Sequence, residues 1–374
     1  MMFKHLAVSI GLAFCAVPGE CTAQQKPAWQ HDAPVSFVRF VESDEQLLTA
    51  TKDGTVRLFD VSTGKEQRRF TTAPAAKSLG PALFALSPDG QLLAIATQEG
   101  RIRLLVVAAG KPDRVIDLNA DKKSRVLGVV CLAFSPDGKA LAIRSKDQSI
   151  HIVGIAEGKL LRSFGEPSSL RPFHGNFFAG GANCDDSLLF LNDNLSLCSV
   201  HVTQDGQQLG TVRLWQFGAN RGKELVQSRF RLNNPFLDAR TGFGIAALAY
   251  RADDTILVAW ASSDGTARLL DFTAEKEIRR LPAVQQGVYV AFAFSPDAKM
   301  LAMRTSNARA IRLDDVASGK RLHVLGDATV TPNQRWPGDT QTLAFSPDGR
   351  KLAEGNGDLL RLWDVATGKE ITPM

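Results

Sequence analysis

The sequence predicts an all-β protein in which seven similar four-stranded antiparallel units close into one ring, a seven-bladed β-propeller. Three observations predict it. A similar segment recurs seven times, each copy divides into short apolar runs bounded by turn residues, and no helical periodicity is evident beyond the first segment of the chain. Seven such units can close a ring in which every unit buries its faces against two neighbours.

The repeat is easiest to see at an apolar residue that precedes a turn of the type Ser-Pro-Asp-Gly. Seven positions align in this way: Phe40, Leu86, Phe134, Ala182, Tyr250, Phe294 and Phe345. Neighbouring positions are 44 to 51 residues apart, except for one interval of 68 residues between Ala182 and Tyr250. A period of roughly 45 residues is typical of four-stranded propeller blades. The long interval predicts an insertion in the fourth unit.

Each unit is expected to contain four short strands joined by tight turns. In the third unit we expect these strands at 129–134, 140–145, 149–155 and 160–164. In the Ser-Pro-Asp-Gly turn, Pro sets φ at the second position, Asp can bond its own backbone, and Gly supplies a positive φ. The Thr-Gly-Lys turns before the last strand place Gly at a similar left-handed position.

The polarity of the strands changes from the first to the last in each unit. The first strand is apolar at every position, as in PALFAL at 81–86, whereas TVRLFD at 55–60 sets Arg57 between Val56 and Leu58. An inner strand between two neighbouring sheets must bury both faces, while an outer strand buries one. Radial stacking of the units explains this gradient.

Four segments carry a resemblance to a known family. LLRLWDVATGKE with Trp363 and Asp364, TVRLFDVSTGKE with Asp60, TVRLWQ with Trp215 and TARLLDF with Asp271 resemble the end of WD40 repeats, and AFSPDGK resembles their first hairpin. The resemblance covers about residues 30 to 374. It implies a WD40-like propeller and says almost nothing about activity.

The chain departs from the WD40 pattern in its polar residues. WD40 blades often link a His, an Asp, a Ser or Thr and a Trp by hydrogen bonds, and no unit clearly holds the full set. The matching residues are Asp53, Asp147 and Asp264, with Trp215 and Trp363, and with His31 and His174. Stability should therefore rest on apolar packing and on ring closure. Either KPAWQ at 26–30 or KEITPM at 369–374 could add the outer strand of the last unit.

The first 23 residues have the three parts of a secretory signal peptide: a basic start, an apolar run at 6–17, and small residues before Gln24. The apolar run is too short to span a bilayer, which needs about twenty residues. We expect cleavage near Ala23 and export to the periplasm or the medium, with no integral membrane segment in the mature chain. A single propeller then occupies 24–374, with blades at about 34–70, 79–118, 126–164, 173–232, 243–281, 286–325 and 338–374.

Composition indicates a soluble globular chain, with 44% hydrophobic and 22% charged residues. The net charge of +5 is spread along the chain, which fits a mixed surface or, more weakly, an anionic partner. Nucleic acid is not expected, because export and the absence of a basic stripe argue against it. Cys131 should be a buried thiol. Cys184 and Cys198 could pair, but the predicted layout sets them at opposite ends of one blade and favours free thiols.

No strong motif for metalloprotease, serine hydrolase, nucleotide or zinc chemistry occurs in the sequence. The Asp residues of the Ser-Pro-Asp-Gly turns lie one to a blade, so they cannot supply the six to eight oxygens that Ca²⁺ takes. The histidines are isolated from one another. No catalytic residue, cofactor or metal is predicted.

Binding is the better prospect, because loops held on a rigid disc commonly carry function. Three long connections between blades mix Arg with aromatic side chains, the residue types that dominate interface energetics. They predict a recognition rim, although the same side chains could instead cap the blade ends. The rim residues are Arg171, Phe173, Phe236, Arg240, Arg335 and Trp336. A projecting hairpin is also expected from the insertion at 192–210 in the fourth unit.

The leading hypothesis is a non-enzymatic exported scaffold, a monomeric propeller that binds a protein or peptide through its loop-bearing face. One alternative is a propeller enzyme with its site in the central channel, which a cluster of inward-facing His, Glu or Arg would support. Another is an envelope-binding periplasmic propeller similar to the TolB family. The RLWDVATGK ending at 361–369 favours the WD40 type.

Overall fold

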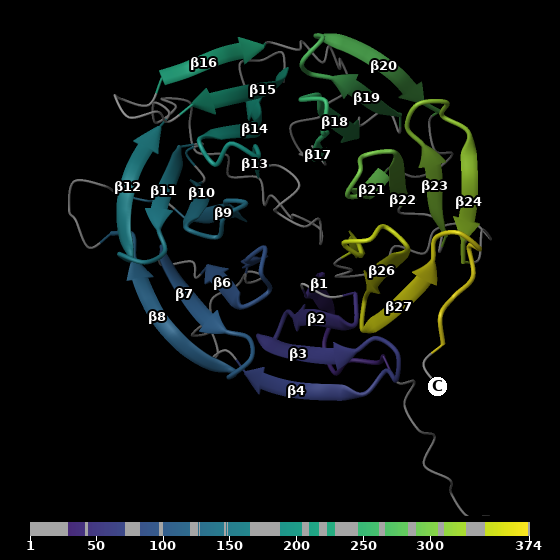
Figure 1. Ribbon diagram of the computed structural model, residues 1–374, viewed down its shortest axis with the longest axis horizontal. Helices are drawn as coiled ribbons and strands as arrows, with labels where there is room; N and C mark the ends of the chain where they lie inside the picture. The colour runs from purple at the N-terminus through teal and green to yellow at the C-terminus, as the bar shows by residue number, and fades with distance from the viewer. Residues whose placement is uncertain are drawn as a thin grey trace, which may run out of the picture.

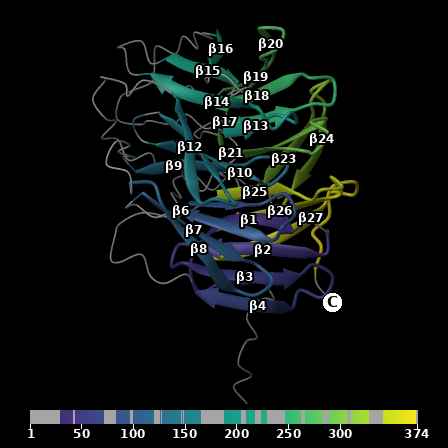
Figure 2. The same cartoon turned by 60° about the vertical axis from the view of Figure 1, so that its left-hand side comes forward.

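The computed structural model contains seven antiparallel sheets arranged around one axis as the blades of a propeller (Figure 1). The structure describes residues 29–41, 44–71, 83–96, 100–119, 126, 128–145, 147, 149–164, 188–203, 209–216, 223–228, 246–261, 266–282, 289–305, 310–326 and 341–372. Both views place the first blade beside the last, so the ring is closed (Figures 1 and 2). The predicted fold class is confirmed.

Strands follow one another from the axis outward in every blade. The innermost strands are β1 (Val35–Val41), β5 (Leu83–Leu86), β9 (Val129–Phe134), β13 (Leu188–Phe190), β17 (Ala246–Tyr250), β21 (Tyr289–Phe294) and β25 (Gln341–Phe345). The second strands are β2 (Gln46–Thr51), β6 (Leu92–Ala96), β10 (Ala140–Ser145), β14 (Ser196–Thr203), β18 (Ile256–Ala261), β22 (Met300–Thr305) and β26 (Lys351–Asn356).

The third strands are β3 (Thr55–Asp60), β7 (Arg101–Val106), β11 (Ile150–Gly154), β15 (Leu209–Gln216), β19 (Ala267–Asp271), β23 (Ile311–Asp315) and β27 (Leu359–Asp364). The outer strands are β4 (Glu66–Thr71), β8 (Lys111–Asp117), β12 (Lys159–Phe164), β16 (Lys223–Ser228), β20 (Lys276–Leu281) and β24 (Arg321–Leu325). The seventh blade thus has three regular strands among the described residues.

Turn chemistry explains where the first hairpin of a blade reverses. In the third blade the Ser135 hydroxyl donates to Asp137 Oδ1 at 2.6 Å, and Asp137 Oδ1 also accepts from the Lys139 amide at 3.0 Å. Gly138 has a φ of 69°, which a residue without Cβ adopts at no steric cost. The predicted Ser-Pro-Asp-Gly turn is therefore present as a local hydrogen-bonded unit.

The Asp of the WD-like ending has a role in the next turn. Asp364 Oδ1 accepts hydrogen bonds from the amide and the hydroxyl of Thr367, each at 2.7 Å. Asp60 Oδ1 accepts hydrogen bonds from the Ser62 hydroxyl and from the amide and hydroxyl of Thr63, and these bonds lower the pKa of the Asp60 carboxyl to about 2. This Asp orders the turn before the outer strand.

The burial gradient differs from the prediction in the third strand. Both faces of β3 are buried, and the Arg57 side chain is only 5% exposed. By contrast, five of the six residues of the outer strand β4 are exposed. The predicted alternation is wrong for β3 because neighbouring elements cover its polar face as well as its apolar one.

The fourth blade corrects the alignment at Ala182. Its innermost strand β13 ends at Phe190, so Phe190 and not Ala182 precedes the first turn. The segment expected to be an inserted hairpin contains the blade's own second strand, β14, which pairs with β15 over eight residue pairs. The alignment failed because this turn reads LNDNLS and lacks the Ser-Pro-Asp-Gly pattern.

Seven buried apolar clusters hold the ring together, and each combines residues of two adjacent blades. In one, Ile102 and Leu104 of β7 pack with Leu132 of β9 and Leu141 of β10. Such burial is worth roughly 1.5–3 kcal/mol for each large side chain. No blade buries its faces alone, so the repeats stabilise one another.

Ring closure uses both ends of the described chain. Gln30 pairs with Leu359 at the start of β27, and Glu370 pairs with Trp363 near its end. The Leu360 amide donates to Trp29 O at 3.2 Å, and the Ile371 amide donates to Leu362 O at 2.7 Å. The two predicted alternatives are thus both partly right, since each terminal segment covers part of the same outer edge.

Side chains of one outer strand also reach the next blade's turn. Arg279 on β20 donates to Ala317 O at 3.1 Å, and His323 on β24 lies 3.1 Å from Ala366 O. A Cβ on Gly319 would overlap the Arg279 guanidinium. A side chain on Gly319 would therefore have to displace the Arg279 guanidinium, in addition to the strain that its φ of 66° imposes.

One interface between blades contains a buried ion pair. Arg304 on β22 contacts Glu354 on β26, and their side chains are 3% and 0% exposed. Removing either partner would leave a charge buried without its counterion.

Cys198 is a free, fully buried thiol, and burial raises its pKa to about 12. Cys131 is also fully buried, as predicted. Cys184 and the predicted signal peptide lie outside the described residues. No helix long and apolar enough to cross a bilayer occurs in the described part of the chain.

Candidate functional site

The six residues of the predicted rim lie outside the described residues. They fall in three connections between blades, at 165–187 (β12 to β13), 229–245 (β16 to β17) and 327–340 (β24 to β25). In an antiparallel blade of this strand order, the connection that leads into the innermost strand lies on the same face of the propeller as the turn between the second and third strands. The corner where residues 29–34 enter the first blade shows how such an entry is built.

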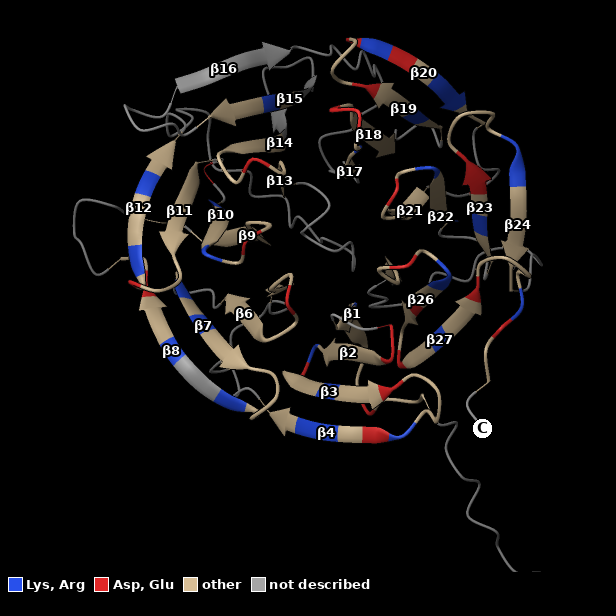
Figure 3. Cartoon of the chain, in the orientation of Figure 1, with Lys and Arg blue, Asp and Glu red and all other residues tan. Residues whose placement is uncertain are grey.

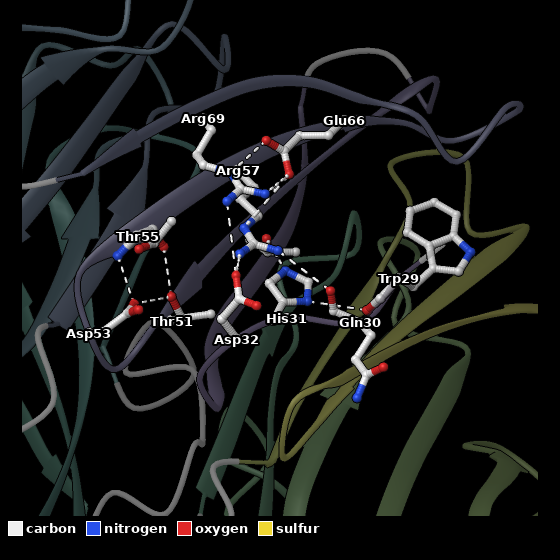
Figure 4. Close-up of polar contacts among 11 residues, drawn as sticks. Trp29, Gln30, His31, Asp32, Thr51, Asp53, Thr55, Arg57, Glu66 and Arg69 are labelled. Atoms are coloured by element: carbon white, nitrogen blue, oxygen red, sulfur yellow. Dashed lines mark hydrogen bonds and ion pairs between the residues drawn. The ribbon is translucent and has the colours of Figure 1, made fainter. Parts of the chain in front are cut away.

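His31 anchors this entry segment (Figure 4). Its Nε2 lies 2.8 Å from Thr49 Oγ1 on β2, and its Nδ1 lies 3.2 Å from Trp29 O. Its ring meets the Phe59 ring edge-on at 5.5 Å, where the WD40 pattern has Trp. The side chain is 2% exposed, so His31 is a packed structural residue at the point where the ring closes.

Burial, followed by the charge of Arg57, lowers the pKa of His31 to about 4. The positive charge of Arg57 disfavours protonation of His31, while the negative charges of Glu66 and Asp32 favour it and partly offset the lowering of the pKa. His31 is consequently neutral at pH 7 in the folded protein.

Beside His31 lies a network of two arginines and two carboxylates (Figure 4). Arg57 Nη2 donates to Asp32 Oδ2 at 2.6 Å, and Arg69 binds Glu66 through two hydrogen bonds of 2.7 and 2.9 Å. Arg57 Nε is also 3.8 Å from Glu66 Oε2, and Arg69 Nη1 is 3.9 Å from Asp32 Oδ2. Each guanidinium therefore faces both carboxylates, and the four charges balance.

The polar set of WD40 blades is distributed over several blades. In the first blade Asp53 Oδ1 accepts from Thr51 Oγ1 at 2.5 Å and from the Thr55 amide at 3.0 Å. In the fourth blade, Trp215 Nε1 donates to Ser199 Oγ at 2.8 Å. Among the described residues, these Asp and Trp contacts thus occur in different blades.

The third blade has a buried cluster that a search for nucleophiles must consider. His151 Nε2 lies 2.9 Å from Ser149 Oγ, and its Nδ1 lies 2.9 Å from Ser163 Oγ. Asp147 Oδ1 accepts from Ser145 Oγ and Ser149 Oγ, each at 2.6 Å. Sequence reasoning missed this cluster because it treated His151 as an isolated strand residue.

The hydrogen bonds of this cluster do not activate Ser149. The carboxylate is the stronger acceptor, so the Ser149 proton goes to Asp147. From the network we therefore assign the His151 tautomer that donates from Nε2 to Ser149 and accepts from Ser163 at Nδ1. A nucleophilic serine needs a base that accepts its proton, and in this arrangement His151 accepts from Ser163 and not from Ser149. The cluster orders the turn at Asp147 and the strands around it.

The central channel was the expected place for an enzymatic site. Among the seven described inner strands, Arg39 on β1 is the only charged residue. Its guanidinium lies 5.7 Å from the centre of the Phe37 ring. No group of three or more His, Cys, Asp or Glu that could hold a metal occurs in the described part of the chain. The described channel wall offers no cluster of acids and bases.

Comparisons with known proteins agree with this architecture. A family model described as the NUP159/214 beta propeller matches residues 13–178. The chain is also 31% identical over 108 residues to apoptotic protease-activating factor 1 of Homo sapiens. That match covers 29% of this chain and 8% of the relative, so it concerns a small part of a much longer protein.

Proposed function

Because the chain is a seven-bladed β-propeller of WD40-like repeats, we propose that it is a non-enzymatic exported scaffold that binds protein or peptide partners on its loop-bearing face. The observation that carries the proposal is a rigid disc whose seven blades are locked by seven shared cores. Such a disc holds loops in fixed relative positions, which favours recognition.

Two further observations support binding over catalysis. The described inner strands have a single charged residue, Arg39, and the Ser149 hydroxyl of the His151 cluster donates its hydrogen bond to the Asp147 carboxylate. The partner surface that we propose is the rim of Arg171, Phe173, Phe236, Arg240, Arg335 and Trp336. Export remains part of the proposal, with a mature chain that begins near Gln24.

The test replaces Arg335 and Trp336 by alanine in the same chain. Crosslinking of the tagged protein in its native envelope or medium identifies what the wild type captures, and the variant should capture less with nearly unchanged thermal stability. Arg350→Ala, a change of an 84% exposed side chain in a turn of the opposite face, is the matched control and should leave capture unchanged.

Two outcomes would contradict the proposal. Collapse of folding in the double variant would assign Arg335 and Trp336 to capping of the blades. Failure to capture any reproducible partner, together with turnover of a small molecule in a substrate screen, would favour an enzyme.

A further inference from the structure

The outer halves of blades one and five have the same three charged residues at the same places. Figure 3 shows the matching pattern of acidic and basic segments on β4 and β20. The residues are Arg57, Glu66 and Arg69 in blade one, and Arg268, Glu277 and Arg280 in blade five.

The backbone geometry of the two blades also matches. Arg57 lies directly opposite Arg69, and Arg268 lies directly opposite Arg280. The register of each strand pair is also irregular at the same point, directly after the residue that follows the third-strand Arg. This point lies between Leu58 and Phe59 in blade one and between Leu269 and Leu270 in blade five. Because the register and its irregularity coincide, the side chains of the two sets start from equivalent positions.

Two cations directly opposite each other on neighbouring strands are destabilising unless anions lie between them. Blade one meets this need with two carboxylates. Glu66 comes from the outer strand itself, and Asp32 comes from the segment that enters the blade. Asp32 Oδ2 lies 2.6 Å from Arg57 and 3.9 Å from Arg69, so one carboxylate oxygen is shared by both guanidinium groups.

Blade five has the first carboxylate but, in the described part of the chain, not the second. Glu277 Oε2 lies 3.5 Å from Arg268 Nη1, and Glu277 Oε1 lies 3.6 Å from Arg280 Nε. No other described carboxylate lies within 4.0 Å of either arginine, so the set has one net positive charge. The Arg268 side chain is 19% exposed, against 5% for Arg57. Arg268 is thus more accessible than its counterpart.

We propose that Arg268 and Arg280 bind a carboxylate of an acidic peptide partner, in the place that Asp32 takes in blade one. Arginine suits this task because its planar guanidinium matches a carboxylate with two parallel hydrogen bonds. The inference rests on the proposed scaffold function and names the chemistry of its partner. Residues 229–245, which include the rim residues Phe236 and Arg240, precede β17 in the sequence, as residues 29–34 precede β1.

The experiment selects peptides from a random displayed library on the full chain and sequences the bound pool. An acidic residue should be enriched, and a synthetic peptide of the enriched sequence should bind Arg280→Gln at least about tenfold more weakly than the wild type. Arg69→Gln is the matched control: it makes the same change at the equivalent place in blade one, where Asp32 already fills the site. The two side chains are similarly exposed, at 56% and 51%, and neither change should affect folding.

The alternatives give different results. Equal weakening in Arg69→Gln and Arg280→Gln, or acidic enrichment that persists on Arg280→Gln, would overturn the inference. Enriched peptides without an acidic residue would overturn it and leave the scaffold function standing, whereas failure to enrich any peptide would contradict both.

Asp238 is the only acidic residue at 229–245. Tighter peptide binding by Asp238→Asn would assign the site to a carboxylate of the same chain and overturn the partner proposal.

Discussion

At the scale of single residues, the polar side chains of this chain mostly maintain its shape. The aspartates at the turns accept local hydrogen bonds, and His31 and His151 are buried and bonded to hydroxyl groups. Burial lowers the pKa of both histidines. Neutral buried histidines make the fold sensitive to acid, because these histidines bind protons at a higher pH in the unfolded chain than in the folded protein.

His31 should therefore contribute to acid lability. Its pKa is about 4 in the folded protein and near 6.5 in an unfolded chain. Above pH 6.5 neither state is protonated; as pH falls toward 4 the unfolded state gains the proton first, and roughly 3 kcal/mol of stability is lost. Denaturant unfolding from pH 7 to 4 should give a shallower loss for His31→Asn than for the wild type. Parallel curves would show that His31 does not titrate in this way.

At the scale of elements, each turn is matched to a neighbour as well as to its own strands. Gly319 and Gly138 have nearly the same backbone, with φ of 66° and 69°. They differ in what lies over them: Gly319 is covered by the Arg279 guanidinium, while the nearest atom to a Cβ on Gly138 is 4.0 Å away in Pro88. Gly319 lies in the turn before an outer strand and Gly138 in the turn after an innermost strand, so glycines of two different turns share a left-handed φ but have different surroundings.

This difference predicts unequal effects of the same substitution. Both Gly319→Ala and Gly138→Ala should lose stability through the left-handed φ, by roughly 1–2 kcal/mol. Gly319→Ala should lose about 1 kcal/mol more, because Arg279 must release Ala317 O. Denaturant unfolding measures both variants. In an Arg279→Ala background the additional loss should vanish, and its persistence there would contradict the close approach.

At the scale of the whole molecule, stability depends on every interface because the sheets form a closed ring. Six of the seven described clusters lie between consecutive blades, and the seventh joins blade one to blade seven. The Arg304 and Glu354 pair adds a charge requirement to the interface of blades six and seven. Our hypothesis is that this buried pair makes the interface specific, so that blades six and seven pack against each other and not against another blade.

Breaking the pair should be costly, and replacing it should not. Glu354→Ala removes the carboxylate that the buried Arg304 guanidinium contacts and should lose roughly 3–5 kcal/mol of unfolding free energy. The double change Arg304→Met with Glu354→Leu should lose much less, because it removes both charges at similar volume. Thermal and denaturant unfolding measure both variants. Equal losses in the single and double variants would show that packing, and not charge, matters at this interface.

The fold class, the number of blades and the turns could be predicted from the sequence, because period, apolar pattern and turn residues are local signals. It failed at Ala182, where the fourth blade lacks the usual turn and the true counterpart is Phe190. The recognition rim remains a prediction, because its residues lie at 165–187, 229–245 and 327–340, outside the described residues.

Tertiary structure alone decided which distant residues meet. It brought Gln30 and Glu370 to the same edge of β27, buried Arg57 against Asp32, and set Arg304 against Glu354. It also made blades one and five comparable, so that a carboxylate present in one marks a place for a carboxylate in the other. The physical reason is that these contacts join residues from different blades or from a blade and the chain end, and only the closed ring sets the distances between them.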